Sequence, residues 1–111
     1  MASEFTYKLT AKAATDLDEI VTYLAVQLEN PQVAAGFLNK LQDAIQEACS
    51  FPESGSRVTN EFLPHKGIRQ KLVGNYIMYY LPDMNTETIY VLRVIYGRRN
   101  LDEILWEMNL S

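Results

Sequence analysis

The 111-residue sequence predicts a single α+β domain spanning 1–111, in which an antiparallel helix hairpin packs on a curved, mostly antiparallel sheet. Three observations support this fold class. An alternating apolar pattern over 5–9 indicates an N-terminal strand, and two amphipathic helical patterns follow it. Three runs rich in β-branched and aromatic residues then occupy most of 68–96. Because 48% of the residues are hydrophobic, the chain can bury a core of its own.

The two helices are marked by their caps as well as by their periodicity. The Thr10 hydroxyl can cap the first helix, whose apolar positions recur at three- and four-residue steps over 13–28. Asn30 and Pro31 end that helix and start another, with Asn30 as N-cap and Pro31 in the first helical position. A second apolar stripe runs over 33–48. Two helices joined by so short a break are expected to form an antiparallel hairpin.

The second half of the chain reads as a loop, three strands and a short helix. Residues 50–66 contain two prolines, one glycine and scattered apolar residues, which is typical of a loop. A Gly-Asn pair at 74–75 predicts a two-residue turn between strands over 68–73 and 76–81. The strand over 88–96 is apolar on both faces except for Arg93, which favours the middle of the sheet. The short C-terminal helix would present Leu101, Ile104, Leu105 and Met108 on one side.

Composition excludes several classes of function. With one histidine and one cysteine, the chain cannot assemble a His/Cys metal site or an internal disulfide, and it carries no Gly-rich phosphate loop. We therefore expect no metal and no cofactor. No apolar run is long enough to span a membrane and no targeting segment is evident, so we expect a soluble, cytoplasmic protein.

The net charge of −4 hides a cationic segment. Residues 57–99 hold seven Lys or Arg against three Asp or Glu, whereas the segments on both sides are acidic. A localised cationic patch on an acidic body can attract an anionic partner. The sequence therefore places the candidate binding residues in this segment.

Five cationic residues of this segment are candidates for one binding surface. Arg69 and Lys71 are two apart on a strand and so share a face, Arg93 lies in a neighbouring strand, and Arg98 and Arg99 follow Gly97. We expect them to gather on the sheet surface turned away from the helices, where they would hold phosphates or a partner's carboxylates. Two structural alternatives stay open. Arg93 would pair inside the fold with a helix carboxylate, and Arg98 and Arg99 would be plain surface residues.

Two further residue types could carry chemistry. His65 lies in a Pro-His-Lys-Gly turn beside the cationic strand, where it is either a general acid or base for RNA cleavage or a solvent-facing loop residue. Tyrosines on the strands either stack bases or pack in the core and on the sheet surface. These tyrosines are Tyr76, Tyr79, Tyr80, Tyr90 and Tyr96.

An ordered set of short motifs resembles the RelE/ParE superfamily of type II toxin–antitoxin toxins. The set comprises Ala-x-x-Asp-Leu-Asp-Glu-Ile at 13–20, Asn-Pro at 30–31, Phe-Pro-Glu at 51–53, Val-Gly-Asn-Tyr at 73–76 and Leu-Arg-Val-Ile-Tyr-Gly-Arg-Arg at 92–99. The resemblance covers nearly the whole chain. It implies the fold predicted above and a toxin function, with two mechanisms in competition.

The RelE-like mechanism is metal-independent cleavage of messenger RNA on the ribosome. By position, Arg69, Lys71 and Arg99 match the catalytic cations of that branch, with His65 as a weaker candidate. The match fails at Ile77, in the region where an arginine is expected. ParE-like members instead inhibit DNA gyrase by binding it, and the two full-length helices and the missing arginine favour that branch. Whether the chain is an enzyme is thus left open, with binding preferred.

Either mechanism implies a cognate antitoxin encoded in the same operon. Its disordered segment would fold on binding and bury apolar side chains in a groove between helices and sheet. A harmless, partner-binding relative is a third reading. The residues expected to bind the antitoxin or the target are Arg69, Lys71, Arg93, Tyr96, Arg98 and Arg99.

Overall fold

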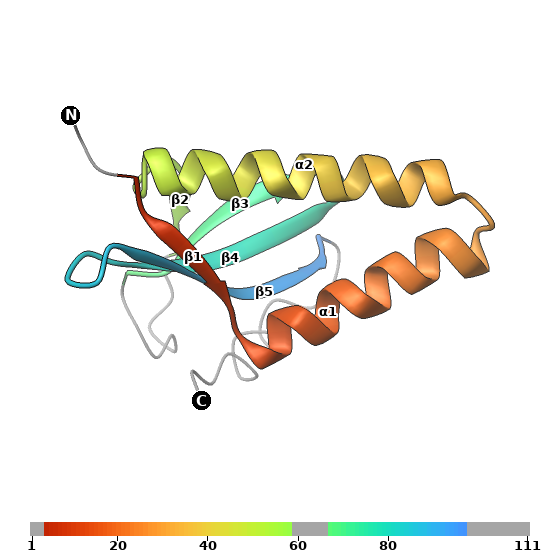
Figure 1. Ribbon diagram of the computed structural model, residues 1–111, viewed down its shortest axis with the longest axis horizontal. Coiled ribbons are helices and arrows are strands. Elements are labelled where there is room, and N and C mark those ends of the chain that lie inside the picture. The colour runs from red at the N-terminus through yellow and green to blue at the C-terminus, as the bar shows by residue number, and fades with distance from the viewer. Residues whose placement is uncertain (1–3, 59–66, 98–111) are drawn as a thin grey trace.

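A computed structural model (Figure 1) describes residues 4–58 and 67–97 and shows two helices lying against a five-stranded sheet. The sheet order is β1-β5-β4-β3-β2, with β1 parallel to β5 and every other pair antiparallel. The elements are β1 (Thr6–Leu9), α1 (Ala11–Thr22), η1 (Tyr23–Gln27), α2 (Pro31–Ser50), β2 (Ser56–Arg57), β3 (Arg69–Val73), β4 (Tyr76–Asp83) and β5 (Thr88–Tyr96). The predicted α+β class is confirmed. The predicted C-terminal helix lies outside the described residues.

The helix caps form as the sequence predicted. The Thr10 hydroxyl accepts a hydrogen bond from the backbone N–H of Ala13, and the Asn30 side chain accepts one from Val33 N–H. Pro31 occupies the first position of α2, where its missing N–H costs nothing. One difference appears in the first helix, because its last turn, η1, is a π-helix rather than a continuation of α1.

The sheet follows from a tight hairpin and a central strand. Gly74 adopts φ +61°, a conformation that glycine reaches without strain, and this turn pairs Val73 with Tyr76. The predicted central strand is confirmed, since β5 lies between β1 and β4. The short strand β2 was not predicted. Its two residues pair with β3, within a segment that the sequence had indicated to be a loop.

Apolar residues are buried on both faces of the sheet. The larger cluster joins the helices to one face and includes Phe37, Leu41, Met78 and Val94. A smaller cluster that includes Tyr79 and Leu92 lies on the other face.

No helix in the described part of the chain is long and apolar enough to cross a membrane.

The helix hairpin does not stay on the sheet along its whole length. In Figure 1 the connection between α1 and α2 lies well beyond the ends of the strands. Leu28 and Val33 belong to the predicted apolar stripes, yet they are 51% and 46% exposed. Their stripe was predicted to face a core, but at the tip of the hairpin there is no sheet beneath it.

Candidate functional site

Arg69 and Lys71 do share one face of β3, as the two-residue spacing predicted. The face itself was predicted wrongly. Lys71 lies opposite Met78 in the β3–β4 ladder, and Met78 belongs to the cluster packed under the helices. Side chains of directly paired residues point to the same face, so both cations point toward the helix layer and not toward the surface turned away from it. Their position therefore brings them next to the end of α2.

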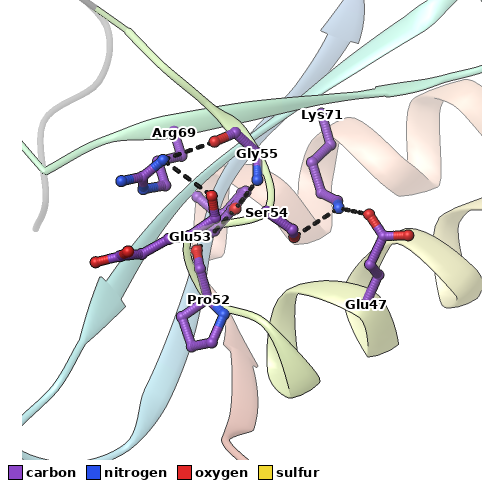
Figure 2. Close-up of polar contacts among 8 residues, drawn as sticks. Glu47, Pro52, Glu53, Ser54, Gly55, Arg69 and Lys71 are labelled. Carbon is purple, nitrogen blue, oxygen red and sulfur yellow. Dashed lines mark hydrogen bonds and ion pairs between the residues drawn. The ribbon is translucent and has the colours of Figure 1, made fainter.

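Lys71 is bound by groups of its own chain (Figure 2). Its ammonium donates to the carboxylate of Glu47 on α2 and to the hydroxyl of Ser54, the latter at 2.8 Å. The Lys71 side chain is only 9% exposed, whereas that of Glu47 is 60% exposed. The lysine stem thus fills space between α2 and β3 while its charge is neutralised within the fold.

Arg69 holds the loop that follows α2. Its guanidinium donates to the carbonyl of Gly55 at 2.7 Å and to the carbonyl of Glu53 at 3.1 Å (Figure 2). The buried hydroxyl of Tyr80 supports the same loop, accepting from Gly55 N–H at 2.8 Å and donating to the carbonyl of Pro52 at 2.9 Å. We call residues 52–55 together with the side chains of Arg69, Lys71 and Tyr80 the loop clamp. Both cations of β3 donate hydrogen bonds to polar groups of this loop.

Arg93 takes the structural alternative that the sequence left open. It is 5% exposed and forms a two-contact ion pair with Asp16 of α1, at 2.7 Å and 3.0 Å. Asp16 also accepts the backbone N–H of Val94 at 3.1 Å. β1 ends at Leu9, which pairs with Val91, so it does not reach Val94 of β5. The Asp16 carboxylate of α1 accepts the Val94 N–H in its place. Arg93 lies two strands away from β3 and turns toward α1.

Of the remaining predicted residues, Tyr96 is described by the structure and three lie outside the described residues. Tyr96 is 47% exposed and lies at the end of β5, beside the β3–β4 turn. His65, Arg98 and Arg99 lie outside the described residues. Among residues 4–58 and 67–97, no group of three or more His, Cys, Asp or Glu side chains is placed to hold a metal ion.

An apolar groove of about 760 Å³ opens between the tip of the helix hairpin and the β3–β4 turn. Its wall contains an aromatic chain in which the Tyr76 ring meets the Phe37 ring edge-on at 5.0 Å and the Tyr96 ring at 5.7 Å. Burial, together with the nearby hydroxyls of Tyr23 and Tyr96, raises the pKa of Tyr76. We call this the tip groove, and it is lined by Tyr23, Leu24, Leu28, Val33, Gly36, Phe37, Lys40, Val73, Gly74, Asn75, Tyr76 and Tyr96.

Sequence reasoning identified Tyr96 but missed the α2 side of the tip groove. Gly36 and Lys40 are one helical turn apart and both line it. A glycine beside the apolar stripe of a helix, followed after one turn by a lysine, is a signal that could have indicated an open site. The stripe alone could not do so, because a groove and a core have the same periodicity.

Comparisons with known proteins agree with this architecture. The sequence model of the ParE toxin of type II toxin–antitoxin systems, parDE, matches residues 7–101. A chain of the toxin–antitoxin complex RelBE2 from Mycobacterium tuberculosis superposes with a TM-score of 0.61 at 21% identity, covering 85% of this chain and 99% of that one. A chain of the chromosomal ParDE system of P. aeruginosa gives 0.64 at 22% identity, covering 84% and 96%. At these identities the two structures show a shared fold.

No curated protein shows significant sequence similarity to the chain. The family model, however, extends over most of the 111 residues, from β1 to beyond the last described strand. The motifs named above fall within this matched range. The chain is therefore a RelE/ParE superfamily toxin and belongs to the ParE toxin family of type II toxin–antitoxin systems.

Proposed function

We propose that this toxin acts in the cytoplasm by binding DNA gyrase and inhibiting it, and that a cognate antitoxin neutralises it. Membership of the ParE family supports a toxin that works by binding. The observation that carries the proposal is the loop clamp. Lys71 and Arg69, which a ribonuclease of this fold would need at the scissile phosphate, are engaged by their own chain.

The chemistry of RNA cleavage makes that engagement significant. A metal-free ribonuclease stabilises the charge of its transition state with cations aimed at the phosphate. Lys71 instead faces a carboxylate, and its side chain is almost fully covered. Bringing RNA to it would require breaking the Glu47 pair and the Ser54 hydrogen bond. A toxin that inhibits by contact has no such requirement.

The antitoxin part of the proposal rests on the tip groove and on the neighbouring structures. Both similar structures are described as parts of toxin–antitoxin systems, and one is a toxin–antitoxin complex. In this chain the tip groove leaves large apolar side chains, such as Leu28 and Tyr96, about half exposed. Apolar surface gathered in one groove is typical of a binding site.

Paired assays with the purified toxin test the proposed target. Gyrase supercoiling of a relaxed plasmid is measured beside messenger RNA cleavage in a translating ribosome system. We expect inhibition of supercoiling, no ribosome-dependent cleavage, and full inhibition by Lys71→Met and His65→Ala. Adding the antitoxin should restore supercoiling.

The opposite pattern identifies the alternative mechanism. Ribosome-dependent cleavage that Arg99→Ala abolishes, with supercoiling unaffected by the wild-type toxin, would contradict gyrase inhibition and establish a ribonuclease. Harmless expression of the chain without any antitoxin would contradict both mechanisms.

A further inference from the structure

The outer side of β1 is an open sheet edge. β1 comes first in the sheet order, with β5 on one side of it and no strand of the described residues on the other. All of its residues, Thr6–Leu9, are exposed, and the side chain of Tyr7 is 53% exposed. Because an edge strand presents backbone groups that lack a ladder partner, it is a ready site for pairing with another strand.

The bonds to β5 determine which backbone groups point outward. The Thr6 N–H donates to the carbonyl of Glu87 at 3.0 Å, so it points toward β5. Since the carbonyl and the N–H of one trans peptide point in opposite directions, the Phe5 carbonyl points away from β5. The Tyr7 N–H, one residue further along the strand, also points away, because these groups alternate with a period of two. One donor and one acceptor therefore lie next to each other on the open edge.

Two opposite charges, Glu4 and Lys8, flank this edge without an ion-pair partner in the described part of the chain. Both residues are exposed, and the Glu4 carboxylate accepts a hydrogen bond from the Ser50 hydroxyl at 3.2 Å. The two charges cannot neutralise each other, because four steps along a strand separate them by about 13 Å. They are therefore available to a second strand.

The sequence around Thr6 is complementary to itself. Residues 4–8 read Glu-Phe-Thr-Tyr-Lys, so an antiparallel copy centred on Thr6 pairs Glu4 with Lys8, Phe5 with Tyr7, and Thr6 with itself. Opposite charges, aromatic pairs and threonine pairs are cross-strand combinations that stabilise antiparallel sheets. The same register brings the Tyr7 N–H of each copy to the Phe5 carbonyl of the other. Side chains and outward backbone groups thus agree on one register.

We propose that β1 is the interface of a toxin homodimer, in which two β1 strands pair antiparallel about Thr6 and join the two sheets into one. The interface uses the same patch on both copies, so it closes at two and does not extend into a filament. A strand of uniform charge would match only one of the two flanking charges, whereas a second copy matches both. This inference goes beyond the proposed function and does not depend on the target of the toxin.

Reversing a charge on either side of Thr6 tests the register. Sedimentation equilibrium of the purified toxin measures the dissociation constant of the dimer. Lys8→Glu and Glu4→Lys should each weaken the dimer at least about tenfold, because both symmetric pairs become repulsive. Asp43→Lys, a matched charge change at an exposed position of α2, should leave the constant within about twofold. Circular dichroism verifies that each variant folds.

Combining the two reversals should restore pairing. In the double variant Glu4→Lys/Lys8→Glu the charges exchange places and again face opposite charges, so its dissociation constant should return to within about threefold of the wild-type value. An equimolar mixture of the two single variants should form a heterodimer, since one copy then carries two cations and the other two anions at the facing positions.

Other outcomes would overturn the proposal. A wild-type toxin that stays monomeric up to about millimolar concentration has no such interface. A dimer that both single reversals leave unchanged lies on another surface, and a mixture of the single variants that stays monomeric rules out the register about Thr6. A monomeric toxin whose binding to the antitoxin is weakened by Lys8→Glu would make the antitoxin the occupant of this edge.

Discussion

The loop clamp and the tip groove each contain a lysine, and the two lysines differ in whether a carboxylate of the same chain pairs with them. At the loop clamp, Lys71 is covered and paired with Glu47. At the tip groove, Lys40 has no carboxylate among the described residues and lies beside exposed apolar side chains. Lys71 reaches from β3 to α2, whereas Lys40 is an exposed residue of α2 that lies near Gly74 in the turn after β3. The difference teaches that the nearness of a carboxylate, rather than residue type, decides which lysine is available to a partner.

Glycine shows the same contrast between the two ends. A Cβ at Gly55 would lie 2.6 Å from the Tyr80 hydroxyl and 2.7 Å from the carbonyl oxygen of Gln70, whereas a Cβ at Gly36 would meet nothing. Gly55 therefore has no room for a side chain, whereas the space in front of Gly36 is open. The same substitution should have opposite effects at the two positions.

The largest expected effect comes from Gly55→Ala. Because both clashing atoms are held, one by hydrogen bonds and one by the backbone of β3, the substitution should lower the free energy of unfolding by about 3 kcal/mol. Urea denaturation followed by circular dichroism measures the change. An unchanged midpoint would mean that the loop at 52–55 is not packed as described.

A smaller loss is expected from Tyr80→Phe. Removing the hydroxyl leaves the buried Gly55 N–H without its acceptor, which should cost about 2 kcal/mol. Tyr96→Phe is the matched change at the tip groove, where the side chain is 47% exposed, and should stay within about 0.5 kcal/mol. If both variants lost the same free energy of unfolding, the loop clamp would be no more tightly packed than the tip groove.

Gly36→Ala should stabilise the toxin by about 0.5–1 kcal/mol. The alanine has higher helix propensity than glycine, and the open space imposes no packing cost. The measurement is again the urea midpoint, with Gly55→Ala as the opposite extreme. A loss of stability at Gly36 would show that the tip groove is filled in solution.

The smallest effects concern the two lysines. Lys71→Met keeps the covered stem but loses the pair with the exposed Glu47, and should cost about 0.5–1 kcal/mol. Lys40→Met should change the free energy of unfolding by less than about 0.5 kcal/mol. In binding to the antitoxin the order should reverse, with Lys40→Met the more damaging. If Lys71→Met weakened antitoxin binding more, the clamp and not the tip groove would carry recognition.

Local sequence signals predicted most of the fold. The helix starts were predicted correctly at Thr10, Asn30 and Pro31, because capping depends on residues within one helical turn. The turn at 74–75 and the strand over 88–96 follow in the same way from local conformation. The strand β2 escaped prediction because two residues carry too little periodicity to be recognised, and only pairing with β3 defines them.

The candidate site was harder to predict. The two-residue spacing placed Arg69 and Lys71 on one face, but it could not say which face, since alternation is the same on both. Their partners belong to α2 and to the loop that follows it. Tyr96 was recognised, whereas Gly36 and Lys40 were not, because they border a stripe that resembles an ordinary core-facing stripe.

By itself, the sequence determined the order of the two helices and of strands β1, β3, β4 and β5, together with the helix caps and the family of this toxin, because these depend on spacings of a few residues. Only the tertiary structure decided which cations are used internally and which remain for a partner. Asp16 and Arg93 are 77 positions apart, and Glu47 and Lys71 are 24 apart. Whether a charge is neutralised depends on the distance in space to an opposite charge, and that distance is set only when the layers pack.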